Sequence, residues 1–276
     1  MSGAFPVVYR AKRWIGAEGG LQRPSGAAYD SREKLLYICD MENGRVAAFG
    51  EADGSLRILG AGTGRVKPVK PLAVSVKEGR IAVTDAEENA VYVYEGPVGW
   101  QKLRTRGRLT LRLPGGIAWG EGNNLYAADF LNKRICVIDQ GLEMTVLHGI
   151  PCGEPYGIFY ARGVLYVADA AYGCIRCYRT ETGELHTLEL CGHRPISVTA
   201  DTAGNIWFSE TRALFRLDIE SGEIAAVVDR RKFREWGFGR PGHIGAVAQL
   251  PDGRIVFTDT LTHCVYCLTP SGGELL

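Results

Sequence analysis

The sequence predicts an all-β protein, a single six-bladed β-propeller with four antiparallel strands in each blade. Three observations support this fold class. A five-residue pattern that ends in an acid recurs six times, with 40 to 49 residues from one acid to the next. Glycine accounts for 36 of the 276 residues, about twice the usual share, which is typical of a chain with many tight turns. No stretch shows a sustained helical period of 3.6 residues, so little helix is expected.

Each repeat contains its elements in the same order. About 13 residues before the acid stands a small residue, and two residues before that stands a proline in five repeats and His243 in the sixth. The second strand ends on the acid, and two more short runs follow after turns. Four short strands in this length are the content of a propeller blade. The acids are Asp40, Asp85, Asp129, Asp169, Glu210 and Asp259, and the small residues are Gly26, Ala73, Gly116, Gly157, Ser197 and Gly245.

The blades are predicted within one domain that covers residues 1–276. Their expected ranges are about 22–60, 69–108, 112–149, 153–191, 193–230 and 240–276. The small residue of each first strand allows six backbones to approach the axis. The sixth blade has too few residues for its own fourth strand. We therefore expect residues 6–14 to pair with it as the outer strand, which closes the ring and covers an exposed edge.

Composition narrows the classes of partner. The 32 basic and 31 acidic residues leave a net charge of +1, which makes nucleic acid an unlikely partner, and the basic run 102–108 is interpreted as an exposed sheet edge. No apolar run approaches the roughly 20 residues of a membrane helix. The first 20 residues contain no secretory signal, so a cytoplasmic location is expected. The eight cysteines, including two CxxC pairs within strands, are interpreted mainly as small buried apolar residues.

The repeat resembles that of the NHL family of six-bladed propellers. Blade one matches its pattern through Pro24, Gly26, Asp40, Asn43 and Arg45. Blade three matches through Pro114, Gly116, Asp129, Asn132 and Arg134, and blade four through the run 155–158. The resemblance implies that ligands bind on one face, around the mouth of the central channel. Architecture alone does not distinguish enzymes from binding scaffolds in such propellers.

The residue between the proline and the small residue is informative about metals. Related calcium lactonases place Glu, Asn or Asp ligands there, and zinc-dependent amidating lyases place His. In this chain the positions are Ser25, Leu72, Gly115, Tyr156, Ile196 and Ile244. Calcium prefers several oxygen ligands and zinc needs three or four donors. The sequence therefore predicts no tightly bound central calcium or zinc, and it leaves a weakly bound magnesium open.

Charged residues near the mouth allow two interpretations each. An acid that recurs in every blade is expected to accept backbone N–H groups of the following turn rather than to catalyse. Cations precede five of the first strands and would attract an anionic ligand, or else form ion pairs with the repeat acids of neighbouring blades. These cations are Arg23, Lys70, Arg112, Arg194 and Arg240, and Glu154 stands before the remaining strand.

The stretch 229–243 departs from the repeat and lengthens the last spacing. It contains Trp236 and Phe238 among glycines and ends at His243. It is either part of a ligand site or an aromatic plug packed on the barrel. Because two histidines and two cations converge there, a small-molecule site is predicted at the mouth between blades four and six. Its expected residues are Tyr156, His193, Arg194, Trp236, Arg240 and His243, with Phe238 nearby.

Blade five, residues 204–210, is similar to the repeat of streptogramin B lyases, which use His and Glu with magnesium for elimination. By position this resemblance implies His243 as the base, Asp259 as its partner and His263 nearby. The sequence therefore supports two functions. One is a lyase- or hydrolase-type enzyme that acts on a small anionic molecule at the channel mouth. The other is a non-catalytic propeller that binds a metabolite, a peptide or a protein partner on the same face.

Overall fold

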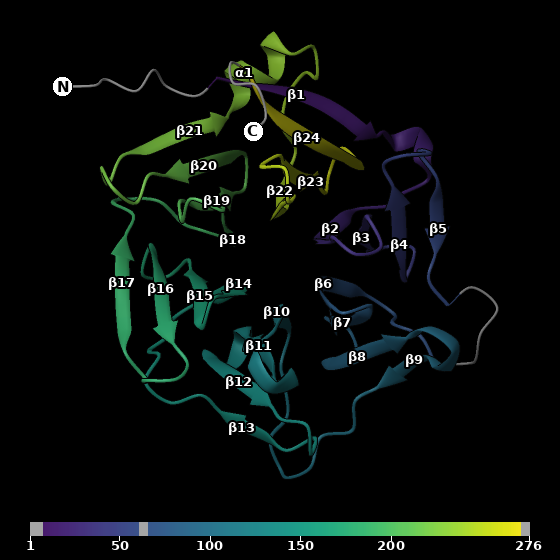
Figure 1. The fold of residues 1–276 in the computed structure, drawn as a ribbon, viewed down its shortest axis with the longest axis vertical. Coiled ribbons are helices and arrows are strands. Elements are labelled where there is room, and N and C mark those ends of the chain that lie inside the picture. The colour runs from purple at the N-terminus through teal and green to yellow at the C-terminus, as the bar shows by residue number, and fades with distance from the viewer. Residues whose placement is uncertain (1–7, 61–65, 272–276) are drawn as a thin grey trace.

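Six four-stranded antiparallel sheets surround a central axis in the computed structural model, which describes residues 8–60 and 66–271 (Figure 1). The predicted six-bladed propeller is confirmed. In blades one to five the strands follow chain order from the axis to the periphery. Blade one comprises β2 (Pro24–Asp30), β3 (Leu35–Asp40), β4 (Arg45–Gly50) and β5 (Leu56–Ile58). Blade two comprises β6 (Pro71–Lys77), β7 (Arg80–Asp85), β8 (Ala90–Glu95) and β9 (Gly99–Lys102).

The next three blades repeat this arrangement. Blade three comprises β10 (Pro114–Trp119), β11 (Leu125–Asp129), β12 (Arg134–Ile138) and β13 (Met144–Val146). Blade four comprises β14 (Pro155–Ala161), β15 (Val164–Asp169), β16 (Cys174–Arg179) and β17 (Leu185–Glu189). Blade five comprises β18 (Ser197–Ala200), β19 (Ile206–Glu210), β20 (Ala213–Leu217) and β21 (Ile224–Val228).

Blade six is built from both ends of the chain, as predicted. It contains β22 (Ile244–Gln249), β23 (Ile255–Asp259), β24 (Cys264–Ser271) and, outermost, β1 (Val8–Ile15). In the antiparallel pair of β1 with β24, Val8 lies opposite Ser271. Residues 6–7 of the predicted closing strand and 272–276 of the predicted last blade lie outside the described residues. Figure 1 shows β1 crossing the periphery of the ring beside β24.

Helix is sparse, as the absence of a helical period predicted. Short 3-10 turns occur at Ala17–Gly19, Gly96–Val98, Glu121–Asn123 and Phe130–Asn132. The irregular stretch before blade six begins with the helix α1 (Arg230–Glu235), which the sequence analysis did not predict. Its N-cap is Asp229, whose side chain accepts a hydrogen bond from the backbone N–H of Lys232 at 2.8 Å.

A bulge occurs at the start of the innermost strand in blades one to four and in blade six. In blade three Pro114 pairs with Asp129 and Ile117 with Ala127, so the two residues Gly115 and Gly116 face one residue of the partner strand. A Cβ atom at Gly116 would lie 2.4 Å from the backbone nitrogen of Ile158 in blade four. The requirement for glycine here therefore comes from the packing of adjacent blades.

Apolar side chains form the core between neighbouring blades. The two CxxC pairs lie on β16 and β24, and none of the eight cysteines forms a disulfide. Burial raises the pKa of Cys177 and of Cys267 to about 12. These two thiols therefore stay protonated at neutral pH, which agrees with their interpretation as small apolar residues.

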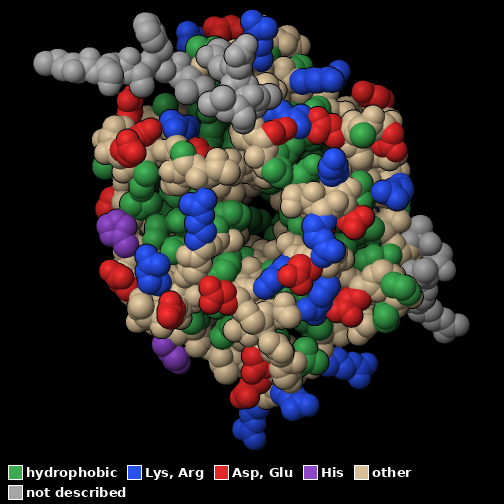
Figure 2. All heavy atoms as spheres, viewed as in Figure 1, with side chains coloured by type: hydrophobic (Ala, Val, Ile, Leu, Met, Phe, Trp, Pro, Cys, Tyr) green, Lys and Arg blue, Asp and Glu red, His purple; other side chains and the backbone are tan. Residues whose placement is uncertain are grey.

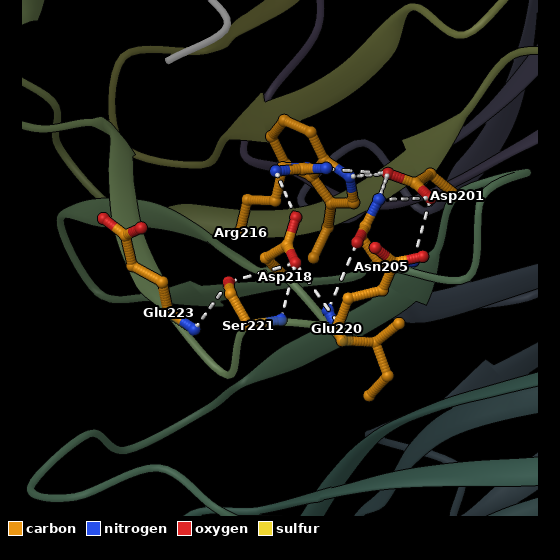
Figure 3. A network of polar contacts seen from close by, with 9 residues as sticks. Asp201, Asn205, Arg216, Asp218, Glu220, Ser221 and Glu223 are labelled. Atoms are coloured by element: carbon orange, nitrogen blue, oxygen red, sulfur yellow. Dashed lines mark hydrogen bonds and ion pairs between the residues drawn. The ribbon is translucent and has the colours of Figure 1, made fainter. Parts of the chain in front are cut away.

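Blade five contains a network of polar contacts away from the axis (Figure 3). The carboxylate of Asp201 accepts hydrogen bonds from Asn205 Nδ2 at 3.1 Å and from Trp207 Nε1 at 3.2 Å. Arg216 lies between Asp201 and Asp218, with nitrogen–oxygen distances of 3.7 and 3.4 Å. The fully buried indole of Trp207 receives Tyr9 of β1 edge-on, with ring centroids 5.3 Å apart. The segment that resembles the lyase repeat thus helps to hold the closing strand.

No helix in the described residues is long and apolar enough to cross a membrane.

Candidate functional site

A cavity of about 510 Å³ lies at one end of the central channel, and we call it the mouth pocket. It is lined by residues that enter the innermost strands and by residues of the turns after the repeat acids. Among its lining residues are Arg23, Lys70, Leu113, Tyr156, Ile196 and His243, one from each blade. On the face shown in Figure 2, the centre of the ring is hollow, with hydrophobic side chains in its depth and Lys and Arg side chains around it.

The mouth pocket has two unlike halves. One half, from blades six, one and two, carries His243 and the cations Arg23 and Lys70 together with the apolar Met41 and Leu72, and we call it the charged half. The apolar half is formed by Leu113, Tyr156 and Ile196, from blades three, four and five. Because these blades follow one another around the ring, each half is continuous. Such a pocket suits a molecule with one ionic end and one apolar end.

The strand register corrects the sequence alignment of blade six by one residue. Ile244 pairs with Asp259 as Pro24 pairs with Asp40, so Ile244 and not His243 occupies the proline position. His243 therefore corresponds to Arg23, directly before the strand. The residue after the proline position, where related propellers carry metal ligands, is therefore Gly245 in blade six, and it has no side chain that could bind a metal.

His243 stands with its imidazole at the mouth pocket. Its backbone N–H donates to Asp259 Oδ1 at 2.9 Å, and its carbonyl accepts from the backbone N–H of Thr260. Within the described residues the imidazole itself has no hydrogen-bond partner. Burial lowers the pKa of His243, the charge of Asp259 opposes this, and the charge of Arg23 lowers it further. The net effect keeps the ring neutral at pH 7, which is the form that accepts a proton.

Asp259 and His263, the other two predicted catalytic residues, are engaged elsewhere. Asp259 is fully buried and accepts backbone N–H groups of Gly242 at 2.8 Å and His243 at 2.9 Å, together with those of the following turn. His263 Nδ1 accepts the backbone N–H of Arg23 at 2.9 Å, which joins blade six to blade one. Asp259 thus contacts His243 through the backbone N–H of His243. The ring of His263 is hydrogen-bonded to the backbone N–H of Arg23.

The other repeat acids serve the blades in the same way. Asp85 accepts the backbone N–H groups of Val69 at 2.6 Å and Lys70 at 2.8 Å, before the innermost strand. It also accepts those of Glu87 and Glu88 in the following turn. The five aspartates of the set are fully buried. The acids therefore fix the segments that form the mouth, which agrees with their interpretation as structural residues.

The predicted cations occupy different places. Arg23 and Lys70 line the mouth pocket, and both form ion pairs with Glu42 rather than with a repeat acid. Arg194 pairs with Glu154 at 2.8 Å beside a separate surface depression of about 590 Å³. Arg112 and Arg240 are exposed and do not line the mouth pocket.

His193, Trp236 and Phe238 also lie outside the mouth pocket. His193 Nδ1 is 2.9 Å from Glu210 Oε1, and its ring packs against Phe215 with centroids 4.4 Å apart. Trp236 and Phe238 pack against the core between blades five and six. Figure 1 shows the adjoining helix α1 at the periphery of the ring. The aromatic residues of the irregular stretch therefore form a peripheral plug between blades five and six, rather than part of the ligand site or a plug on top of the barrel.

The residues at the mouth do not fit the metal sites of related propellers. Ser25, Leu72, Gly115, Tyr156, Ile196 and Gly245 occupy the informative positions. Across residues 8–60 and 66–271, no group of three or more His, Cys, Asp or Glu side chains is placed to hold a metal ion. We therefore derive no chemical step from a metal.

Two residues were not expected from the sequence. Leu113 lines the mouth pocket, and Glu42 forms ion pairs with the lining residues Arg23 and Lys70. Glu42 stands two residues after the repeat acid, where the six blades carry Glu42, Glu87, Leu131, Ala171, Arg212 and Leu261. A column that varies within an otherwise regular repeat is the signal that could have identified it. Variation marks positions that the blade does not need for its own folding.

The fold and the site define a six-bladed propeller with a pocket at the end of its axial channel. No protein-family model matches the chain, and no curated protein sequence matches it. Solved structures show the same fold. A streptogramin B lyase is 15% identical with a TM-score of 0.69, covering 95% of this chain and 98% of its own. A gluconolactonase from Xanthomonas campestris is 15% identical with a TM-score of 0.69, covering 98% and 99%. The virginiamycin B lyase from Staphylococcus aureus is 16% identical with a TM-score of 0.64, covering 95% and 99%.

Proposed function

We propose that this propeller binds a small anionic molecule in the mouth pocket and that His243 removes a proton during a lyase- or hydrolase-type reaction. The observation that carries the proposal is a neutral imidazole without a hydrogen-bond partner in the described residues, beside Arg23 and Lys70 in a largely apolar pocket. A base with a pKa below neutrality is ready to accept a proton at pH 7. The cations orient the anion and stabilise negative charge that develops on it.

The NHL-type assignment belongs to the same proposal. Its support is that the Asp, Asn and Arg of the pattern form one hydrogen-bonded cluster in two blades. Asp40 Oδ2 accepts from Asn43 Nδ2 at 2.8 Å and from Arg45 Nε at 2.6 Å. Asn132 and Arg134 make the same contacts to Asp129, each at 2.8 Å. A cytoplasmic location is proposed with it, because the eight unpaired thiols suit a reducing compartment.

The test of binding is a thermal-shift screen of carboxylates, phosphates and sulfates, with and without magnesium. A ligand at 100 times its Kd should add about 2.7 kcal/mol to the free energy of unfolding. Arg23→Gln should weaken binding at least about tenfold, through loss of a charge-assisted hydrogen bond. The matched control is Arg57→Gln, because Arg57 is exposed on the outer strand of blade one. Equal losses in both variants would refute the mouth pocket as the site.

The test of catalysis uses the ligand from that screen. His243→Gln should abolish turnover and leave the Kd within a few-fold, because the imidazole acts on the bound molecule. His186→Gln is the matched control, since His186 is exposed on β17. Turnover that persists in His243→Gln would exclude this residue as the base.

A second function, a non-catalytic propeller that binds a protein partner, is favoured by a different observation. Apolar side chains are exposed in the turns of the mouth face, with 49% of Leu131, 57% of Tyr172 and 54% of Leu261 accessible. Contiguous apolar patches are typical of interaction surfaces, and these three side chains lie in the turns after the repeat acids of blades three, four and six. If the ligand binds without chemical change and these residues are needed for partner binding, this function replaces the enzyme.

A further inference from the structure

One carboxylate oxygen holds both cations of the charged half. Arg23 Nη1 lies 3.3 Å and Lys70 Nζ lies 3.8 Å from the same Oε1 atom of Glu42. About two fifths of each of these three side chains is exposed, at 44%, 38% and 39%. Within this cluster of three side chains, two positive charges face one negative charge, and Glu87, which lines the same pocket, forms no ion pair with either cation in the described residues. The pair of cations is thus only partly neutralised by the protein itself.

The backbones that carry the three side chains are fixed. The backbone N–H of Arg23 donates to His263 Nδ1 at 2.9 Å, and that of Lys70 donates to Asp85 at 2.8 Å. The backbone N–H of Glu42 donates to the carbonyl of Gln22 at 3.1 Å. The two cations are therefore held side by side, and the carboxylate of Glu42 can leave them by side-chain rotation alone.

The guanidinium of Arg23 has unused donors. Its Nε is buried and meets no acceptor in the described residues, while Glu42 contacts Nη1 through a single oxygen. Arginine binds carboxylates most strongly when both oxygens are engaged. Glu42 is therefore an incomplete partner for this side chain.

We infer that Arg23 and Lys70 form an oxyanion subsite that Glu42 occupies in the absence of ligand, and that the ligand is an amphipathic carboxylate which displaces Glu42. This inference rests on the proposed function, because it names the ligand class of the same pocket. The carboxylate of the ligand takes the place of the Glu42 carboxylate between the two cations. Its apolar body lies over Leu113, Tyr156 and Ile196, the apolar half of the mouth pocket.

The structure favours a carboxylate over a phosphate, because Arg23 and Lys70 already accommodate one carboxylate between them. A monoanion that replaces the Glu42 carboxylate leaves the charge between the two cations unchanged. Glu42 then turns into water, where a side chain that is already exposed is readily hydrated. Exposed ion pairs contribute about 0–1 kcal/mol, so displacement of Glu42 costs little. The bound monoanion gains the second Arg23 contact that Glu42 does not make.

The apolar half supplies a separate contribution to binding. Each CH₂ group buried there should improve the Kd about fourfold, since its burial is worth about 0.8 kcal/mol. A ligand without an apolar body would bind only through the ionic contacts. The inference therefore predicts that both ends of the ligand are required.

Isothermal titration at constant ionic strength tests the inference with four probes. They are 3-phenylpropionate, acetate, 3-phenylpropan-1-ol and phenyl phosphate. We expect 3-phenylpropionate to bind most tightly, because acetate lacks the apolar body and the alcohol lacks the charge. Glu42→Gln should tighten its binding about two- to fivefold, the range that an ion pair of up to about 1 kcal/mol allows.

The matched control is Glu87→Gln, because Glu87 stands at the position of blade two that corresponds to Glu42, lines the mouth pocket, and has no ion pair within the described residues. It should change the Kd less than Glu42→Gln does. Glu42→Ala serves as a second variant of the same position, and melting temperatures verify that each variant is folded.

Four results would overturn the inference. If Glu42→Gln and Glu87→Gln change the Kd equally, Glu42 acts only through its negative charge and does not occupy the subsite. If 3-phenylpropan-1-ol binds as tightly as 3-phenylpropionate, the two cations do not form an oxyanion subsite. If phenyl phosphate binds more tightly than 3-phenylpropionate, the ligand class is a phosphate and not a carboxylate. If none of the four probes binds, the ligand class is wrong. In each case the anion screen with Arg23→Gln decides independently whether the proposed function stands.

Discussion

His243 shows how a residue of the site depends on the register of a single strand. The sequence places it correctly near the mouth, because it precedes a first strand and breaks the proline pattern. It could not place the residue within its blade, since the distance from the small residue to the acid varies between blades. The pairing of Ile244 with Asp259 decides that His243 corresponds to Arg23. This shift puts the imidazole in the charged half of the pocket.

The pH dependence of stability should report the environment of His243. Burial lowers its pKa in the folded protein below the ordinary value of 6.5, so the unfolded chain takes up this proton first as the pH falls. Its contribution is complete above about pH 6.5 and is lost progressively as the pH falls towards the folded pKa. Relative to His243→Gln, the wild type should therefore lose melting temperature between pH 7.5 and pH 5. The same comparison with His186→Gln is the control, and a difference independent of pH would contradict the assignment.

At the scale of elements, α1 and the loop after it explain why sequence reasoning could not choose between a ligand site and an aromatic plug. A helix of six residues with one apolar side chain is too short to show a helical period. Phe233 is fully buried, and its ring lies 5.0 Å from Tyr266 and 5.7 Å from Phe238. These contacts depend on three separate segments, which no local pattern reveals. The blades themselves were predictable because each repeats the same local pattern.

We expect Phe233→Ala to lower the free energy of unfolding by about 3–5 kcal/mol, the usual cost of removing a buried phenyl ring. Because the plug lies away from the mouth pocket, the variant that remains folded should bind the ligand of the screen with an unchanged Kd. Urea denaturation and titration measure the two quantities. Arg234→Ala is the control, since Arg234 is exposed on the same helix. If Phe233→Ala loses binding without a loss of stability, the stretch 229–243 belongs to the ligand site after all.

At the scale of the whole molecule, the fold follows from counting repeats, and the function does not. Six acids with similar spacing determine six blades whatever residues line the channel. The solved structures with 15% or 16% identity share this architecture. The side chains that distinguish the mouth pocket, such as Arg23 and Leu113, stand at positions that differ from blade to blade, and these cannot be inferred from a repeat. Their arrangement into a charged half and an apolar half emerges only when the ring is closed.

Removal of β1 should destabilise the whole ring. A chain that begins at residue 16 leaves β24 as an exposed edge and removes Tyr9 from Trp207. We expect a loss of several kcal/mol, a large part of the stability of a typical domain, or aggregation. A chain that begins at residue 8 keeps β1 and should melt near the wild-type temperature. Calorimetry on both truncations measures the effect, and equal melting temperatures would show that β1 does not secure the ring.

The pairing of Val8 with Ser271 also determines when the ring can close during synthesis. These two residues are 263 positions apart, so at about 5–20 residues per second the ribosome needs roughly 13–50 s between them. During that interval the five preceding blades can fold, while the first strand waits for a partner that has not yet been made. The exposed charges of Arg10, Lys12 and Arg13 help to keep that waiting strand from pairing with the edges of other chains. Among the described strands, β24 is thus translated last, and it completes a sheet whose outer edge, β1, is translated before all the others.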